Sequence, residues 1–523
     1  MIRHAVHDRF ITIKEQIIRM KNIKLFPQQL ITKGVVFFIV ALFFVSCKKS
    51  NPEPEPEPPP VERDANAMIR DSVYYYYKLY SLWADDYIPA YENPYEFTDQ
   101  YRSAQSVLTA LKGMTPAYPN YRDYGGVYDR FSFMEGLSGY DIGAQAKVKM
   151  DRADGYGLYF DMGTVDSKTA QPIIYFVEGG SPADIAGLKR SDIVLSINGE
   201  SDYAVEIDCE GNDGCKAVDP SALGKIRSRL NSALDGSTLT IEVQHEDKST
   251  SIEQLSYRTY TIDPIYKDSV YHYTGKNIGY LALSSFEEIE NNNFNQVKVD
   301  GVFQKFEEQH IEDLVVDLRY NTGGYVDAAV YIANKIGGTK TDKKLMVTYK
   351  ANAHMERVQK GPNGMFKDTY FSGGSSLSLR KVYFLVSEST ASAAEMLINV
   401  LKPYFDVQVI ATGTRTYGKP VGFFEQIIEN KISFWPASFQ LKNADGFSEY
   451  WDGLAADKSN VTDYIFLDSG NTAETMLETA LEDAVPGSSL RASARRSARS
   501  DNGRVLQGNS INQLPEKGLL KSR

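Results

Sequence analysis

Hydrophobic and polar positions follow different periods along the chain, and the change of period divides it into regions. Between residues 61 and 114, apolar side chains recur every three or four positions, for example at Met68, Val73 and Tyr77, which predicts amphipathic helices. From residue 155 to residue 262, short apolar runs such as IIYFVE and DIVLSING alternate with glycine-containing and charged turns, which is typical of a β-rich module. We therefore expect a helical N-terminal domain over residues 61–150 and a β module over residues 151–265.

The pattern changes again from residue 266. Continuous apolar runs (IGYLAL, LVVDL, VYFLV, VQVIA) are separated by stretches with helical spacing. Such strands, joined through helices, indicate a largely parallel sheet that is covered on both faces. The chain as a whole is therefore predicted to be a multi-domain α/β protein, with an α/β domain over residues 266–485. The low-complexity sequence that follows predicts a disordered basic tail over residues 486–523.

One long apolar run precedes these regions. Residues 34–46, GVVFFIVALFFVS, are too few to span a bilayer but suit the core of an export signal. We expect a signal peptide over residues 1–46, with Met20 as a natural start that would make residues 1–19 an upstream extension. Cys47 follows the small residue Ser46, which resembles the lipobox of bacterial lipoproteins. The sequence thus predicts lipidation of Cys47 and anchoring to a membrane of the bacterial cell envelope.

The segment after the cysteine and the overall charge narrow the choice of compartment and partner. Residues 47–60 contain alternating proline and glutamate, which predicts an extended tether and a folded part that faces the periplasm or the cell surface. There, Cys209 and Cys215 are expected to form a disulfide. Their acidic loop lacks the glycine of an EF-hand, so we expect no metal. The net charge of -11 leaves no basic field for nucleic acid.

Candidate chemistry lies where three strands of the α/β domain are predicted to end, because ligand sites of open α/β sheets form there. The first strand is followed by residues 319–324, RYNTGG, whose glycines allow backbone N–H groups to face a ligand. The second is followed by residues 387–395, SESTASAAE, which lead into a helix and place hydroxyls at its N-terminus. The third is followed by residues 413–420, GTRTYGKP, which present one lysine.

A nucleophilic serine needs a base, and none of the six histidines follows a predicted core strand. A lysine serves when burial keeps it neutral, and Lys419 has Tyr417, Pro420 and Phe423 as apolar neighbours.

These segments resemble the C-terminal processing (tail-specific) serine proteases, whose catalytic domain has a crotonase-like α/β fold and carries a PDZ domain. The resemblance implies Ser392 in STASAAEM as nucleophile and Lys419 in TYGKP as general base. It also implies an oxyanion hole formed by the N–H groups of Ala393 and of Gly323 or Gly324. No cofactor is implied.

A second part of the chain carries the same resemblance. Residues 179–200, GGSPADIAGLKRSDIVLSINGE, are similar to the core of a PDZ domain. Gly157 and Leu158 would then lie near its carboxylate-binding loop, which captures a C-terminal segment by adding it as a strand. The implied protein is a lipid-anchored endopeptidase that acts on protein or peptide substrates through their C-terminal or extended segments.

The sequence departs from the family at one position and leaves alternatives open. Relatives often have a glutamine four residues after the lysine, where this chain has Phe423, and Glu425 or Gln426 are candidates to replace it.

Ser392 could serve only as a helix N-cap, with Ser387 or Ser389 as the nucleophile. The rival function is a PDZ-containing peptide-binding lipoprotein without activity. A crotonase-like acyl-transfer enzyme is a third option, but no nucleotide site is evident.

Overall fold

The structure is a computed structural model that describes residues 63–118, 126–136, 151–209, 215–360, 364–488, 505–506, 514 and 519–520. The predicted signal peptide, Cys47 and the tether lie outside these residues. Among the helices that are described, none is long and apolar enough to cross a membrane.

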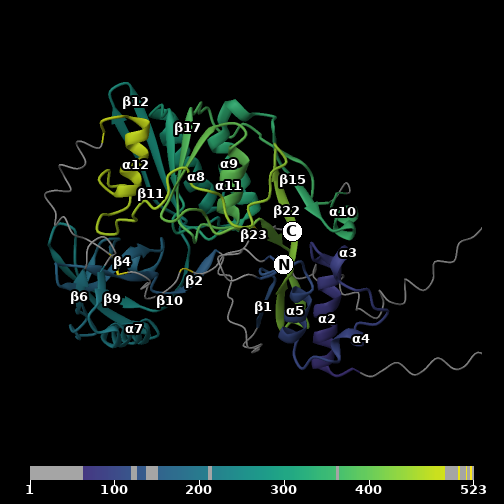
Figure 1. Ribbon diagram of the computed structural model, residues 1–523. Coiled ribbons are helices and arrows are strands. Elements are labelled where there is room, and N and C mark those ends of the chain that lie inside the picture. The colour runs from purple at the N-terminus through teal and green to yellow at the C-terminus, as the bar shows by residue number, and fades with distance from the viewer. Residues whose placement is uncertain are drawn as a thin grey trace, which may run out of the picture. The chain divides into compact units, whose positions relative to one another are not determined.

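A five-stranded sheet forms the centre of the α/β region (Figure 1). Its strands, in spatial order, are β11 (Ile265–Tyr273), β12 (Lys276–Leu283), β13 (Asp313–Asp317), β17 (Lys381–Val386) and β18 (Asp406–Ala411). The last four run parallel to one another, and β11 pairs antiparallel to β12 at the edge. Every residue of β13 is buried, as the apolar run LVVDL predicted for a strand with both faces covered.

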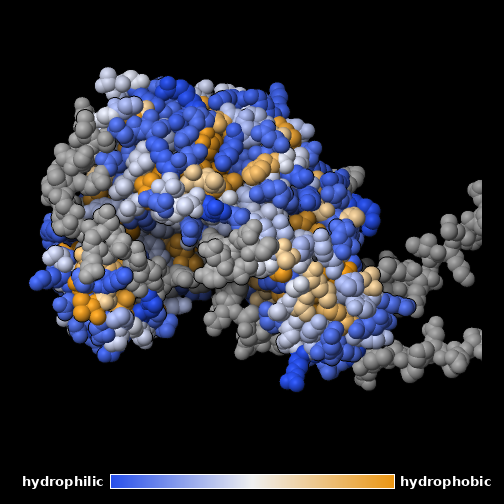
Figure 2. All heavy atoms as spheres, viewed as in Figure 1, coloured by the Kyte–Doolittle hydropathy of each residue, from blue (hydrophilic) through white to orange (hydrophobic). Residues whose placement is uncertain are grey.

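Helices cover both faces of this sheet. They are α8 (Phe294–Glu308), α9 (Val326–Thr341), α11 (Ala393–Leu401) and α12 (Thr475–Ala484). Leu314 and Val316 of β13 share a core with α8, α9 and α11, whereas Val315 between them packs with α12 on the opposite face. Hydrophilic residues cover most of the visible surface over this region (Figure 2). The mixed α/β class predicted from the sequence is confirmed.

A second sheet lies beside the ends of these strands. Its order is β14 (Gly324–Tyr325), β23 (Leu519–Leu520), β19 (Val421–Phe423), β22 (Ala437–Asn443), β15 (Leu345–Ala351) and β16 (Thr369–Tyr370), with α10 (Ala353–Gln359) following β15. The strand β23 pairs parallel to both β14 and β19. The prediction of a disordered tail is therefore wrong at Leu519–Leu520, because the backbone there completes the hydrogen bonding between two other strands.

The N-terminal region contains the helices that its spacing predicted, namely α2 (Ala65–Tyr80), α3 (Ala84–Tyr87), α4 (Tyr95–Thr98) and α5 (Ala104–Gly113). It also contains β1 (Phe133–Gly136), which pairs antiparallel with β21 (Ile432–Trp435), itself paired with β20 (Gln426–Ile428). The helices share one hydrophobic core with Ile432 and Phe434. Residues 61–150 were expected to form a helical domain, but the described part shares a sheet and a core with the C-terminal half.

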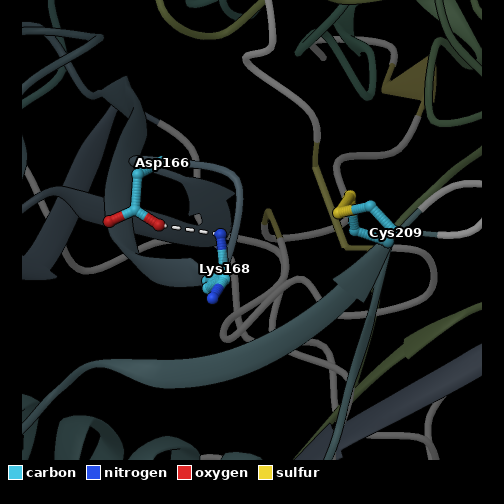
Figure 3. The surroundings of a disulfide bond; sticks show 4 residues. Asp166, Lys168 and Cys209 are labelled. Atoms are coloured by element: carbon cyan, nitrogen blue, oxygen red, sulfur yellow. Dashed lines mark hydrogen bonds between the residues drawn. A yellow bond between two sulfur atoms is a disulfide. The ribbon is translucent and has the colours of Figure 1, made fainter.

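The β module consists of strands with one helix of 4 residues and one of 15 residues. These elements are β2 (Arg152–Gly155), β3 (Leu158–Thr164), β4 (Thr169–Val177), α6 (Pro182–Ile185), β5 (Ile193–Ile197), β6 (Val205–Cys209), β7 (Cys215–Ala217), α7 (Pro220–Leu234), β8 (Thr238–Gln244), β9 (Thr250–Ser256) and β10 (Arg258–Thr261). A disulfide joins Cys209 and Cys215 at the ends of β6 and β7 (Figure 3). In the same surroundings, the Asp166 carboxylate accepts a 2.8 Å hydrogen bond from the Lys168 N–H. The disulfide closes the short loop between two paired strands.

Candidate active site

Ser392 lies in the turn between β17 and α11, at the N-cap position of the helix. Its φ angle is 64° and its side chain has no exposed surface. Its Oγ has no hydrogen-bond partner. A left-handed backbone at a residue with a side chain is strained, and a buried hydroxyl without a partner costs stability. Such costs are typical of functional sites, where the strain holds a reacting group in place.

The two other serines considered as nucleophiles are placed differently. The Ser387 Oγ donates a 2.6 Å hydrogen bond to the Arg319 carbonyl. Ser389 is exposed, and its N–H donates to the Ser387 Oγ. Ser387 thus bonds the first turn of the site to the second, and of the three serines only Ser392 combines burial with an unpartnered hydroxyl.

Glu395, in the first turn of α11, connects the serine turn to the lysine turn. Its fully buried carboxylate accepts hydrogen bonds from the N–H groups of Ser392 (2.9 Å), Gly418 (2.7 Å) and Lys419 (2.8 Å), and from the Thr416 hydroxyl (2.5 Å). The Ser392 and Lys419 N–H groups reach the same oxygen, Oε2. One carboxylate oxygen therefore holds the backbones of both predicted catalytic residues close together.

Burial raises the pKa of the Glu395 carboxyl, and the hydrogen bonds from Thr416, Lys419, Ser392 and Gly418 oppose that rise. Four donors facing two oxygens favour the ionised form, which only accepts. The sequence analysis did not assign Glu395 a role. The sequence pattern that could have pointed to Glu395 is the capping box, in which a glutamate follows three residues after a serine at the start of a helix.

Lys419 is buried, with 6% of its surface exposed, and its Nζ lies 5.0 Å from the centre of the Phe423 ring. That distance suits a cation–π contact if the lysine is charged and apolar packing if it is neutral. The preceding Gly418 has φ 93°, and a Cβ there would lie 2.3 Å from the Trp451 carbonyl oxygen. Arg130, from the N-terminal region, donates to the carbonyls of Gly418 and Trp451. The lysine turn is therefore fixed by a close backbone contact and by a distant arginine.

The third turn contains the predicted oxyanion donors. The Gly323 N–H donates a 2.9 Å hydrogen bond to the Asn321 side chain. Gly324 has φ 140°, and a Cβ there would lie 2.2 Å from the Phe286 carbonyl oxygen. Ala393 is the first residue of α11, where a helix N–H has no partner within the helix. Ala393 and Gly324 thus suit the role better than Gly323, whose N–H already has a partner.

Backbone hydrogen bonds join the three turns directly. The Ala391 N–H donates to the Asn321 carbonyl at 3.2 Å, and the Tyr417 N–H donates to the Thr390 carbonyl at 2.9 Å. The structure thus brings together the segments that the sequence analysis placed at three separate strand ends.

A cluster of charged residues lies next to these turns. Arg319, with 1% of its side chain exposed, contacts the carboxylates of Asp317 (2.6 Å), Asp463 (2.6 Å) and Glu474 (3.0 Å). Arg190 of the β module also contacts Asp463, at 2.6 Å. Although burial raises it, the charges of Arg190 and Arg319 lower the pKa of Asp463 to about 2. The cluster joins the β module to the turn of residues 319–324 that follows β13.

In the β module, Gly157 and Leu158 lie at the start of β3. Gly157 has φ 72°, and a Cβ there would lie 2.2 Å from the Cβ of Ser181. Leu158 is buried. Both residues line a cavity of about 150 Å³ together with Asp154, Glu178 and neighbouring tyrosines.

Residues 277–432 match the model of peptidase family S41. The chain is 27% identical over 341 residues to a "Probable CtpA-like serine protease" of Staphylococcus aureus (strain N315), covering 63% of this chain and 56% of that protein. It is 25% identical over 327 residues to a protein of the same name in Staphylococcus epidermidis (strain ATCC 35984), covering 62% and 55%. The chain thus spans about half the length of these relatives.

A solved structure agrees in fold. The crystal structure of a "Putative S41 protease" from Bacteroides fragilis NCTC 9343 matches with a TM-score of 0.55 and 21% identity, over 79% of this chain and 96% of that one. At this identity the match shows the fold alone.

Proposed function

We propose that the protein is a serine endopeptidase in which Ser392 is the nucleophile and Lys419 the general base. One observation carries the proposal. The buried, unpartnered hydroxyl of Ser392 and the buried Lys419 belong to two turns that share a single oxygen of Glu395. The match of residues 277–432 to the model of peptidase family S41 supports the same chemistry.

In this mechanism the Ser392 Oγ attacks the scissile carbonyl carbon, and its proton passes to the neutral Nζ of Lys419. The N–H groups of Ala393 and Gly324 stabilise the oxyanion of the tetrahedral intermediate. Lys419 then returns a proton to the leaving amine, which leaves an acyl-enzyme that water hydrolyses. Glu395 is a positioning residue, because it contacts the two turns rather than the substrate.

We assign substrate recognition to the β module as a PDZ-like domain. The strand β3 and the cavity at Gly157 and Leu158 would receive a C-terminal segment of a protein substrate by strand addition. Cleavage of a peptide with a free C-terminus should then be faster than cleavage of the same peptide with an amidated C-terminus. Equal rates would contradict this part of the proposal.

The decisive experiment replaces the base. In Lys419→Arg the guanidinium stays protonated and cannot accept the serine proton, so cleavage of a reporter peptide should be lost between pH 6 and pH 10. Lys350→Arg, at an exposed position of β15, is the matched control and should retain activity. Retained activity in Lys419→Arg would exclude the Ser/Lys pair, whereas peptide binding without cleavage by the wild-type chain would favour the non-catalytic rival.

We also propose that the protein is a lipoprotein of the bacterial cell envelope, on the strength of the apolar run followed by Cys47. Cys47→Ala should move the mature protein from the membrane fraction to the soluble fraction. Mature, unlipidated protein that stays with membranes would place the anchor elsewhere.

A further inference from the structure

Part of the C-terminal tail lies on the β module. Val505 pairs antiparallel with Gly163 of β3, and the Leu506 N–H donates a 3.0 Å hydrogen bond to the Met162 carbonyl. Leu506 is 1% exposed and belongs to the same hydrophobic core as Leu223 and other residues of α7. The tail therefore forms an isolated β-bridge with β3, the strand that we assign to substrate recognition.

A second part of the tail lies at the proposed active site. In β23, Leu519 pairs with Gly324, and Leu520 pairs with Tyr325 on one side and with Phe423 on the other. The strand β14 begins at the proposed oxyanion donor Gly324, and β19 begins two residues after Lys419. The strand β23 thus lies between the segments that continue from two of the three turns of the site.

We propose that the tail is an intramolecular inhibitor that occupies the strand position between β14 and β19 which an extended substrate would take. The proposal rests on the peptidase function above. The backbone hydrogen-bonding groups that face this position can pair with only one strand at a time, so tail and substrate exclude each other.

The contact of Leu506 with the β module holds the tail near the proposed active site and thereby strengthens the inhibition. A segment held on the same chain competes at an effective local concentration, which for a short connection is in about the millimolar range. A free peptide substrate must then exceed that concentration or bind more tightly than the tail. A substrate that displaces the tail from β3 removes this advantage and so weakens the binding of the tail next to β14.

The first test replaces both leucines of β23 in the full chain. Leu519→Pro/Leu520→Pro removes two backbone N–H groups, and Leu519→Ala/Leu520→Ala is the matched control that keeps them. If the tail occupies the site roughly nine-tenths of the time, the proline variant should lower KM for a short reporter peptide about tenfold with kcat unchanged. The alanine variant should show a smaller change. Equal KM values in wild type and proline variant would overturn the proposal.

The second test measures binding without catalysis. A fluorescein-labelled peptide of residues 514–523, LPEKGLLKSR, is titrated into the inactive Ser392→Ala chain with and without the two prolines. We expect it to bind the proline-containing chain at least about tenfold more tightly, because its site is vacated there. Equal affinity, or no binding to either chain, would overturn the proposal. Competition for binding without cleavage by any variant would reject the peptidase function instead.

Mass spectrometry of the intact chain separates an inhibitor from a substrate. The wild-type tail should keep its full length over hours at the concentration used for assays, as in Ser392→Ala. Loss of C-terminal residues in the wild type alone would show that the tail is a substrate and would overturn its role as an inhibitor.

Discussion

Two buried polar clusters follow neighbouring strands of the parallel sheet, and they differ in how completely they are bonded. Around Arg319, which follows β13, three carboxylates surround the guanidinium. Around Ser392, which follows β17, the Glu395 carboxylate is fully bonded but the serine hydroxyl has no partner. Complete bonding stabilises a fold, whereas one unbonded group in an otherwise bonded cluster is available for chemistry. The comparison predicts that substitutions in the two clusters act on different properties.

The largest expected effect is on activity. Ser392→Ala should reduce peptide cleavage to background, because no other hydroxyl replaces the nucleophile. The free energy of unfolding should change by less than about 1 kcal/mol, since the lost hydroxyl makes no hydrogen bond. Ser389→Ala, at an exposed position of the same turn, should leave both properties unchanged. Cleavage assays combined with urea unfolding test this pair, and an active Ser392→Ala would remove the distinction between the clusters.

The next effect is on stability. Arg319→Met should lower the free energy of unfolding by about 3–5 kcal/mol, because Asp317 and Glu474 would remain buried without their cation. Lys360→Met, in an exposed pair with Glu356, should cost less than about 1 kcal/mol. Thermal and urea unfolding measure both. Equal losses of unfolding free energy in the two variants would mean that the buried cluster stabilises the fold no more than a surface ion pair does.

Glu395→Gln should combine both properties. The amide replaces one acceptor by a donor that faces N–H groups, so we expect a loss of about 1–3 kcal/mol in stability. Cleavage should also slow, with kcat falling more than KM rises, because the Ser392 and Lys419 backbones lose their common anchor. Glu308→Gln, exposed near the end of α8, serves as control. A stable Glu395→Gln with unchanged kcat would show that the shared oxygen does not position Ser392 and Lys419.

The smallest effect concerns a partly buried carboxylate of the β module. Burial raises the pKa of Asp161 in β3 to about 7. Between about pH 4 and pH 7 the folded state thus binds a proton that the unfolded state has lost, so this group makes stability fall as pH rises through that window. Asp161→Asn should flatten that part of the pH dependence of urea unfolding. An unchanged slope would show that Asp161 ionises normally, despite its burial.

The sequence was sufficient for the elements that depend on local patterns. Continuous apolar runs predicted the parallel strands, and the residues directly after them predicted the three turns, because each of these signals lies in consecutive residues. The sequence was insufficient where distant segments meet. The bonds of Glu395 to Gly418 and Lys419, and of Arg190 to Asp463, link positions whose proximity no local pattern encodes.

The prediction of a disordered tail was wrong for a different reason. Its composition predicts disorder, because it has too few apolar residues to form a core of its own. Leu506 and Leu519–Leu520 instead use a core and a sheet that other parts of the chain have already built. Composition predicts whether a segment can fold by itself, so it does not predict a segment that becomes ordered by binding to another part of the chain.

The contact between Arg130 and the carbonyl of Gly418 joins residues 288 positions apart. Arg130 lies outside the segment that matches the family model, residues 277–432, whereas Gly418 lies within it. The strand β1, which pairs with β21, also lies outside that segment. A recombinant fragment cut at the limits of that match would lose Arg130, which supports the lysine turn. It would also end at the first residue of β21, so β20 would lose its paired strand and expose an edge, which favours aggregation. A gene that encodes only the matching segment would therefore still match the family model, but its product would lack strands and contacts that the fold requires.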